Sequence, residues 1–187
     1  MTVTLLEAIC ELHLALKQAE VPHAFGGALA LAWCIGEPRA TNDIDLNIFT
    51  APDNAAAILN VLPKGITSDE TNRSRLERNG QDRLWWGRIP VDLFLSNTPF
   101  HERVAQGVVH HPFNGYDMPF LSCQALATFK AFFNRDKDWL DLRSMVEHSS
   151  IDTQELIKDL SDLLGDDDPR VLKAEELLSS PPDHSAY

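Results

Sequence analysis

The chain has 187 residues, of which 44% are hydrophobic, and a formal net charge of −12 at pH 7. This length allows one substantial core, or one domain with a small helical addition, and no apolar stretch reaches membrane-spanning length. The N-terminal residues include acids where a secretory signal carries bases, so we expect a cytoplasmic protein with no membrane partner.

Most of the negative charge lies near the C-terminus. Residues 136–187 contain 14 acids and 5 Lys or Arg, a balance of −9, whereas residues 1–135 carry only −3. The sign reverses in Lys64–Arg88, called the basic stretch below, which has a net charge of +2. This stretch is a candidate contact for the phosphates of a nucleotide or an RNA end, and a solvated Arg-rich surface is an equal alternative.

The three cysteines, Cys10, Cys34 and Cys123, lie far apart on apolar helical segments. We therefore expect buried free thiols and neither a disulfide framework nor a zinc site. Redox chemistry is not indicated.

A diglycine turn lies between the first expected strand and the second expected helix. Helix Thr4–Glu20, whose apolar residues recur at spacings of three and four, precedes it. Gly26 and Gly27 then follow the extended run Val21–Phe25 and open the alanine-rich helix Ala28–Cys34. Glycines without Cβ atoms let a phosphate approach the backbone, and the N–H groups at a helix start favour an anion. A Gly-Gly pair alone is usually only a turn.

A pair of aspartates lies on the strand that follows. In the segment DIDLNIF, which starts at Asp43, a period of two places Asp43 and Asp45 on one face and the aliphatic residues on the other. Two neighbouring carboxylates repel each other unless a cation lies between them, and their hard oxygens suit Mg²⁺ that carries substrate phosphates. A lone D-x-D is common on solvated strands, but the combination with the diglycine turn predicts a nucleotide and metal site.

At this point the segment FGGALALAWCIGEPRATNDIDLNIF, Phe25–Phe49, resembles the nucleotidyltransferase superfamily with the polymerase-β-like fold. In that superfamily a Gly-Gly or Gly-Ser turn opens a helix and an aspartate pair lies on the next strand. The spacing Arg39-x-Thr41-x-Asp43-x-Asp45 is most similar to the AbiEii/MenT-type toxin branch. The resemblance covers roughly residues 20–145, and it implies that Arg39 and Thr41 join Gly26 and Gly27 in the NTP site.

The middle of the chain is expected to form a helix, a segment that is ambiguous between helix and loop, and two strands. These are, in order, Ala51–Leu62, Ser68–Asn79, Arg83–Trp86 and Ile89–Leu95. Asp92 lies in the second strand, on the face opposite its aliphatic residues. A lone acid in a strand is more often exposed than catalytic. The superfamily resemblance implies that Asp92 is the third acid, which deprotonates the acceptor hydroxyl or completes a metal shell.

A short helix, Pro99–Gln106, is expected next, followed by a hairpin or irregular pair of Val108–Phe113 and Gly115–Phe120. His110 and His111 are adjacent, so on a strand they face opposite ways. We expect surface or packing roles for both histidines, because this spacing is poor for a shared metal.

Strong helical patterning begins near Gln124, with Ser122 as the cap, and continues to His148, with a break near Asp136 as an alternative. In a continuous helix one broad face would carry the charged residues Lys130, Lys137, Asp138 and Asp141. This face is either an exposed salt-bridged surface or part of a site. The toxin branch resembles this pattern, with a helical lysine followed by R-x-K-D-x-x-D. The resemblance implies that Lys130 contacts the triphosphate and that Lys137, Asp138 and Asp141 position the nucleotide or the lysine.

Two more helices, Asp152–Gly165 and Asp166–Ser179, are expected before a frayed tail at Pro181–Tyr187. The expected fold is α/β (α+β), with a polymerase-β-like core of mixed sheet and flanking helices followed by a C-terminal helical bundle. We expect the core at 1–121, a helical region that closes the nucleotide cleft at 122–180, and a flexible tail at 181–187.

The resemblance implies a nucleotidyltransferase that moves an NMP from an NTP to an acceptor hydroxyl with Mg²⁺ or Mn²⁺ and releases pyrophosphate. Asp43, Asp45 and Asp92 would hold metal, and Lys130 would meet the charge that builds as pyrophosphate leaves. The expected protein is the toxin of a type IV-like toxin–antitoxin pair, acting on tRNA or other RNA 3′ ends through the basic stretch, with a cognate antitoxin as partner.

Two alternatives remain. A small-molecule nucleotidyltransferase that modifies an antibiotic is one, because R-x-T-x-D-x-D also resembles lincosamide-modifying enzymes. A non-catalytic module that binds a nucleotide or partner is the other, and the intact aspartate pair disfavours it, since unused neighbouring carboxylates would only repel.

Overall fold

The computed structural model of the chain describes residues 3–179, so the expected tail at 181–187 lies outside the described residues. The described residues form two compact units. One combines the residues up to Leu29 with Arg39–Leu121, and the other combines Ala30–Pro38 with the residues from Ser122 onward. None of the helices within the described range has both the length and the apolar character that crossing a membrane requires.

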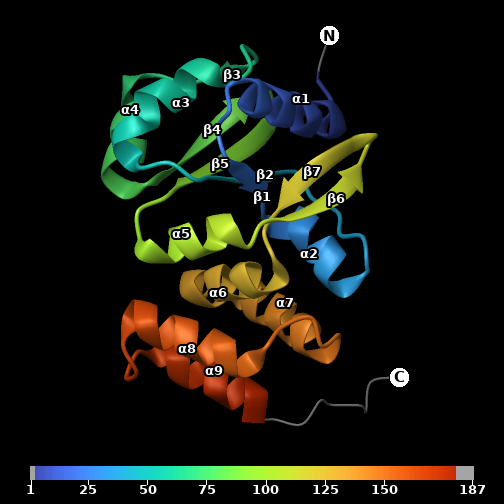
Figure 1. The fold of residues 1–187 in the computed structure, drawn as a ribbon, viewed down its shortest axis with the longest axis vertical. Coiled ribbons are helices and arrows are strands. Elements are labelled where there is room, and N and C mark those ends of the chain that lie inside the picture. Colours follow the sequence, from blue (N-terminus) through green and yellow to red (C-terminus); the bar gives the residue numbers. More distant parts are fainter. Residues whose placement is uncertain (1–2, 180–187) are drawn as a thin grey trace. The chain divides into compact units, whose positions relative to one another are not determined.

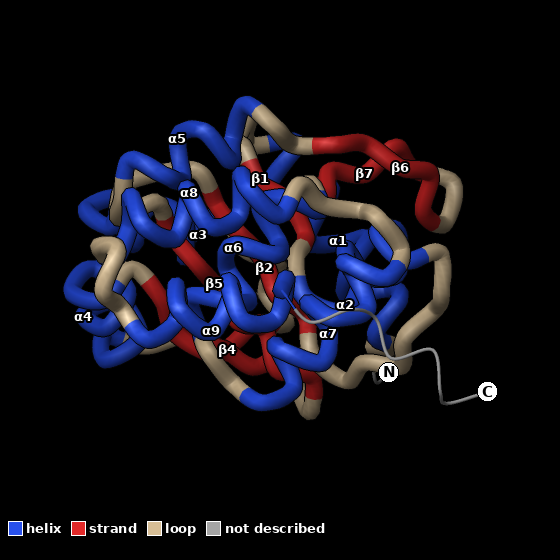
Figure 2. Tube along the Cα trace, turned by 90° about the horizontal axis from the view of Figure 1, so that it is seen from below, coloured by secondary structure: helices blue, strands red, loops and turns tan. Residues whose placement is uncertain are grey.

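A mixed seven-stranded sheet, with strand order β3-β4-β5-β2-β1-β7-β6, organises the first unit (Figure 1). Strand β2 runs parallel to β5 and antiparallel to β1, and β1 runs parallel to β7. Figure 2 shows β6 and β7 as two adjacent strands, which form an antiparallel hairpin. The strands are β1 (His23–Phe25), β2 (Ile44–Ile48), β3 (Ile66–Thr67), β4 (Gln81–Trp86), β5 (Ile89–Leu95), β6 (Val109–Phe113) and β7 (Tyr116–Phe120).

The helices of this unit begin and end at residues that suit those positions. Helix α1 starts at a capping box, in which the Thr4 hydroxyl accepts from the Glu7 N–H and the Glu7 carboxylate accepts in return. The ambiguous segment forms α4, which starts at a second capping box on Asp69 and ends at Gly80, with φ 69°. The remaining short elements are η1 (Pro52–Asn54), α3 (Ala55–Val61) and α5 (Pro99–Gln106), beside α1 (Leu5–Gln18) and α4 (Glu70–Asn79).

Strand alternation builds the core and turns the acids away from it. The core includes the aliphatic residues of β2 and, from β5, Val91, Leu93 and Leu95, and α4 packs against β4 and α3 (Figure 1). Each fully buried Leu or Ile contributes about 1.5–3 kcal/mol to folding. Because successive side chains point to opposite faces, the same burial turns Asp45 and Asp92 to the other face of the sheet.

The second unit is helical. It contains the end of α2 (Gly27–Ile35) together with α6 (Cys123–Phe133), α7 (Asp136–Glu147), α8 (Thr153–Leu164) and α9 (Pro169–Ser179). Asn134, with φ 58°, ends α6, so the helical pattern is broken just before Asp136. The expected fold class, an α/β core of mixed sheet and flanking helices followed by a helical region, is confirmed.

The cysteine prediction is wrong for two of the three residues. Cys34 in α2 and Cys123 at the start of α6 form a disulfide within the second unit, with their Cα atoms 5.5 Å apart. This distance is usual for a disulfide. The two residues are 89 positions apart, so local sequence patterns gave no sign that the fold joins them. Cys10 is free and buried, as expected.

Candidate active site

The diglycine turn closes tightly around Asp45. It lies between β1 and α2, and the Gly26 N–H donates to the Asp45 carbonyl at 2.9 Å. Gly27 has φ +54°, and a Cβ at this position would lie 1.8 Å from Asp45 Oδ2. Any other residue would therefore be strained and would displace the carboxylate.

Gly26 is also closely surrounded. A Cβ there would lie 3.0 Å from Asn47 Nδ2 and 3.1 Å from Leu121 Cδ1. Asn47 is buried, with 4% of its surface exposed, and follows Asp45 by two residues on the same face of β2. The period of two in DIDLNIF puts Asn47 on the face of Asp43 and Asp45, although no site role was expected for it.

Asp43 lies just before β2, and Thr41 holds its carboxylate. The Thr41 hydroxyl donates to Asp43 Oδ1 at 2.6 Å, and the Asp43 N–H lies 3.3 Å from the same hydroxyl oxygen. Thr41 thus contacts a predicted metal ligand. Arg39, the other NTP-binding residue implied by the resemblance, is exposed.

Asp45, Asp92 and Arg83 lie in a row across three neighbouring strands. Asp45 of β2 pairs in register with Asp92 of β5, which pairs with Arg83 of β4. The Arg83 guanidinium donates to both oxygens of Asp92, with Nε 2.6 Å from Oδ1 and Nη2 2.7 Å from Oδ2. This is a bidentate, charge-assisted pair.

The electrostatics of this row favour the charged guanidinium. The hydrogen bonds to Asp92, together with the negative charges of Asp92, Asp43 and Asp45, raise the pKa of Arg83 above its ordinary value, although burial opposes the change. From the sequence, Arg83 was expected in the basic stretch and at the start of a strand, without a role in the site. Counting outward from the Gly87-Arg88 turn pairs Arg83 with Asp92, so the strand register of the hairpin predicts this ion pair.

The carboxylates of Asp43 and Asp45 suit a divalent metal ion better than that of Asp92. Within residues 3–179, no group of three or more His, Cys, Asp or Glu side chains is arranged to hold a metal ion. Mg²⁺ is commonly bound by one or two carboxylates and by substrate phosphates. Asp43, oriented by Thr41, and Asp45, with the space that Gly27 leaves, fit that pattern. The third predicted ligand, Asp92, is engaged by Arg83.

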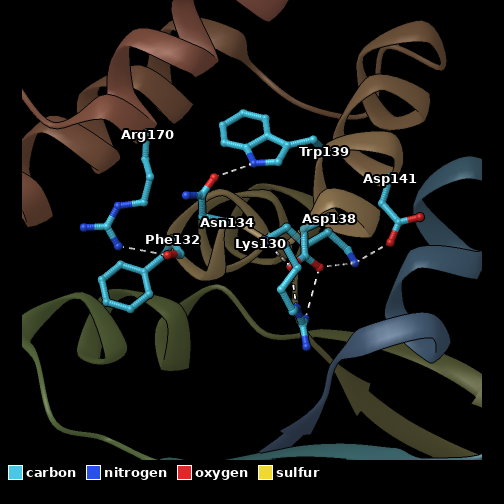
Figure 3. A network of polar contacts seen from close by, with 8 residues as sticks. Lys130, Phe132, Asn134, Asp138, Trp139, Asp141 and Arg170 are labelled. Atoms are coloured by element: carbon cyan, nitrogen blue, oxygen red, sulfur yellow. Dashed lines mark hydrogen bonds and ion pairs between the residues drawn. The ribbon is translucent and has the colours of Figure 1, made fainter.

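A second cluster of predicted residues is buried in the helical unit (Figure 3). Lys130 Nζ donates to Asp141 Oδ2 at 2.7 Å and lies 3.7 Å from Asp138 Oδ1. Lys130 is 7% exposed, Asp141 9% and Asp138 0%. The structure therefore brings these three residues together in the interior of the unit, and they do not form an exposed salt-bridged surface.

Arg135 completes this cluster, and the sequence analysis missed its role. Its guanidinium donates to both oxygens of Asp138, with Nε at 2.6 Å, and its backbone N–H donates to the same carboxylate. The signal was the three-residue spacing from Arg135 to an acid in the first turn of α7. Lys137, by contrast, is exposed.

A family model and several solved structures are similar to this chain. The family described as "Nucleotidyl transferase AbiEii toxin, Type IV TA system" matches residues 12–184. No match was found among curated proteins. The solution structure of the antibiotic-resistance factor ANT(2″)-Ia is similar, with 13% identity, a TM-score of 0.62, and coverage of 87% of this chain and 92% of that chain.

Two further structures share the fold. ANT(2″)-Ia in complex with adenylyl-2″-tobramycin has 13% identity and a TM-score of 0.61, and covers 86% of this chain and 97% of that one. The lincomycin-bound lincosamide antibiotic adenylyltransferase LnuA has 11% identity and a TM-score of 0.53, with coverage of 79% and 99%. The expectation of a nucleotidyltransferase is confirmed by the family match, and this chain belongs to the AbiEii nucleotidyl transferase toxin family.

Proposed function

We propose that this nucleotidyltransferase acts at the sheet face that carries Asp43, Asp45 and Asp92. The observation that carries the proposal is the fit of Gly27 against Asp45, because a turn with no room for a Cβ keeps that carboxylate in place. An acceptor oxygen attacks the α-phosphorus of an NTP, the bond from that phosphorus to the β-phosphate oxygen breaks, and pyrophosphate leaves. The acceptor proton passes to a base.

Individual residues have separate tasks in this scheme. Asp43 and Asp45 hold Mg²⁺ or Mn²⁺, and a bound divalent ion supplies positive charge to the phosphates of the substrate. The Gly26 N–H already bonds the Asp45 carbonyl, so phosphate contacts fall to the N–H groups of α2 from Gly27 onward. Asp92 accepts the acceptor proton. The contact of Lys130 with the leaving pyrophosphate stays a prediction, because its ammonium is buried beside Asp138 and Asp141.

The remaining predicted residues support these groups. Thr41 orients Asp43, and Arg39 contributes positive charge to the NTP site. Asp138 and Asp141 hold the Lys130 ammonium, and Lys137 lies at the exposed start of α7 for contact with the nucleotide. Closure of the nucleotide cleft by the helical region 122–180 stays a prediction, as does a cytoplasmic location.

For the acceptor, we propose an RNA 3′ end such as that of tRNA, with a cognate antitoxin as protein partner. The family description, a toxin of a type IV system, supports the antitoxin partner. Several cations of the basic stretch are paired with acids: Arg73 with Glu70 and Glu77, and Arg75 with Asp82. An RNA contact therefore rests on the exposed residues Lys64, Arg78 and Arg88.

The experiment replaces Lys64, Arg78 and Arg88 together by glutamine and measures RNA labelling from each labelled NTP over a salt series. RNA labelling should fall and lose salt sensitivity, while NTP binding stays unchanged. Replacement of the paired Arg73 and Arg75 by glutamine serves as the control. Labelling that equals that of the wild type at every salt concentration would exclude this RNA path.

A small-molecule acceptor is the second candidate. The shared fold with ANT(2″)-Ia and LnuA and the R-x-T-x-D-x-D spacing favour it. Label that appears on a hydroxylated antibiotic and never on RNA would select this alternative.

A further inference from the structure

The Arg83–Asp92 pair leaves Asp92 without an easily available oxygen. Both carboxylate oxygens accept hydrogen bonds from one guanidinium, at 2.6 and 2.7 Å. A bidentate arginine occupies both oxygens of the carboxylate that it faces. A cation that approaches Asp92 therefore has to share or displace Arg83.

The guanidinium also carries positive charge at the place where a metal would bind. The charges of Asp43, Asp45 and Asp92 all act favourably on Arg83. Because like charges repel, the Arg83 guanidinium opposes a divalent cation that approaches those three carboxylates. Asp43 differs from Asp92 in this respect, because its carboxylate accepts a hydrogen bond from the neutral hydroxyl of Thr41.

The arginine has space in which to move. The Arg83 side chain is 51% exposed, whereas the Asp92 side chain is only 18% exposed. The pair joins neighbouring strands at the solvent face of the β4–β5 hairpin, where a long side chain can leave its partner without opening the core.

From these observations we propose that Arg83 is a positioning residue that competes with a divalent cation for Asp92. Arg83 holds the Asp92 carboxylate in the metal-free protein, and Asp92 joins the metal site only when Arg83 is displaced. The protein then has two classes of metal-binding site. The tighter class lies at Asp43 and Asp45, and the weaker class includes Asp92, where Arg83 lowers the affinity for metal. The inference rests on the proposed function, since it assumes that Asp43 and Asp45 bind metal.

The test measures Mn²⁺ binding to the full chain from the electron paramagnetic resonance signal of free Mn²⁺, without NTP or acceptor. Arg83→Gln should tighten the weaker class about tenfold, because a nearby positive charge and a competing donor are removed. Arg83→Lys keeps the charge but loses the bidentate guanidinium, so the Mn²⁺ affinity of the weaker class should lie between those of the wild type and Arg83→Gln. Arg103→Gln removes the same charge from the exposed side of α5 in the same unit and should leave both classes unchanged.

A double variant fixes the site of the effect. In Arg83→Gln combined with Asp92→Asn, the gain should disappear, because the released carboxylate is gone. Thermal unfolding of each variant checks that the fold is kept. Arg83→Gln that binds Mn²⁺ no more tightly than wild type, while Asp43→Asn still weakens binding, overturns the inference alone. Absence of Mn²⁺ binding in the wild type overturns both the inference and the proposed metal site.

Discussion

The carboxylate of Asp45 occupies the space that a side chain at position 27 would need, since a Cβ on Gly27 would lie 1.8 Å from Asp45 Oδ2. Gly27→Ala should therefore displace the carboxylate as well as strain the backbone at φ +54°. We expect Mn²⁺ binding and nucleotidyl transfer to fall by about a hundredfold, the size of effect that a small misplacement of a catalytic group produces.

Gly87→Ala is the matched control for this variant. Gly87 has φ +60°, and a Cβ there would meet nothing within 4 Å. It therefore carries similar backbone strain without a clash. Transfer activity in Gly27→Ala that equals that of Gly87→Ala would show that the contact with Asp45 has no functional role.

The buried cluster around Lys130 should be sensitive to the loss of one acid. Asp138→Asn removes the charge of one of the two acids beside the buried Lys130 ammonium and leaves Asp141 as its partner, so we expect a loss of about 1.5–3 kcal/mol, the size of a hydrogen bond to a charged group. Urea unfolding measures this loss. The control is Asp162→Asn, which breaks an exposed pair with Lys158 and should cost less than about 1 kcal/mol. Similar losses in the two variants would contradict the buried network.

Acid should destabilise the first unit through a buried histidine pair. His13 Nδ1 lies 3.0 Å from His23 Nε2, and burial lowers the pKa of His23 from 6.5 to about 4, partly opposed by its bond to the Val21 carbonyl. Below pH 6.5 the unfolded state gains a proton that the folded state accepts only near pH 4. The free energy of unfolding is therefore highest above pH 6.5 and falls by about 3 kcal/mol between pH 6.5 and 4.

His23→Gln should flatten the pH dependence of the unfolding free energy in that range. The exposed His148 offers a control, because His148→Gln should leave the slope unchanged. A slope in His23→Gln that matches that of the wild type would exclude the histidine pair as the source.

Reduction of the disulfide should destabilise the second unit. The Cys34–Cys123 bond closes a loop of 89 residues, for which chain entropy gives about 4–5 kcal/mol. Dithiothreitol should therefore lower the melting temperature of the wild type and have no effect on Cys34→Ser. Equal melting temperatures of the wild type with and without reductant would contradict a stabilising disulfide, and mass spectrometry of the protein alkylated directly from cells shows whether the bond forms there.

Local pattern predicted the parts of this protein that depend on neighbouring residues. Alternation in DIDLNIF and in the strand with Asp92 gave the right faces of β2 and β5, because burial of every second side chain is a local property. The diglycine turn was placed correctly for the same reason. Its tight contact with Asp45 was not foreseen, since that contact joins the start of α2 to β2 through space.

Long-range contacts account for what the sequence did not predict. The disulfide joins residues 89 positions apart, and the pairing of His13 with His23 depends on how α1 packs beside β1. Arg83 was counted as part of a basic surface because charge counts ignore strand register. In the structure, the register of β4 and β5 places Arg83 opposite Asp92. The break at Asn134 was left open because Asn tolerates both helix and left-handed conformations.

The most direct test of the account is nucleotidyl transfer with and without the aspartate pair. The wild type and the Asp43→Asn/Asp45→Asn variant are incubated with each NTP labelled at the α-phosphate, Mg²⁺, total RNA and a set of hydroxylated antibiotics, and both the labelled acceptor and released pyrophosphate are measured. We predict label on RNA 3′ ends with one pyrophosphate for each label in the wild type. The variant should remain folded and lose at least about a thousandfold in rate, because it keeps the shape of the site and loses its negative charge. Transfer by the double variant at the wild-type rate would contradict the assignment of the site to Asp43 and Asp45.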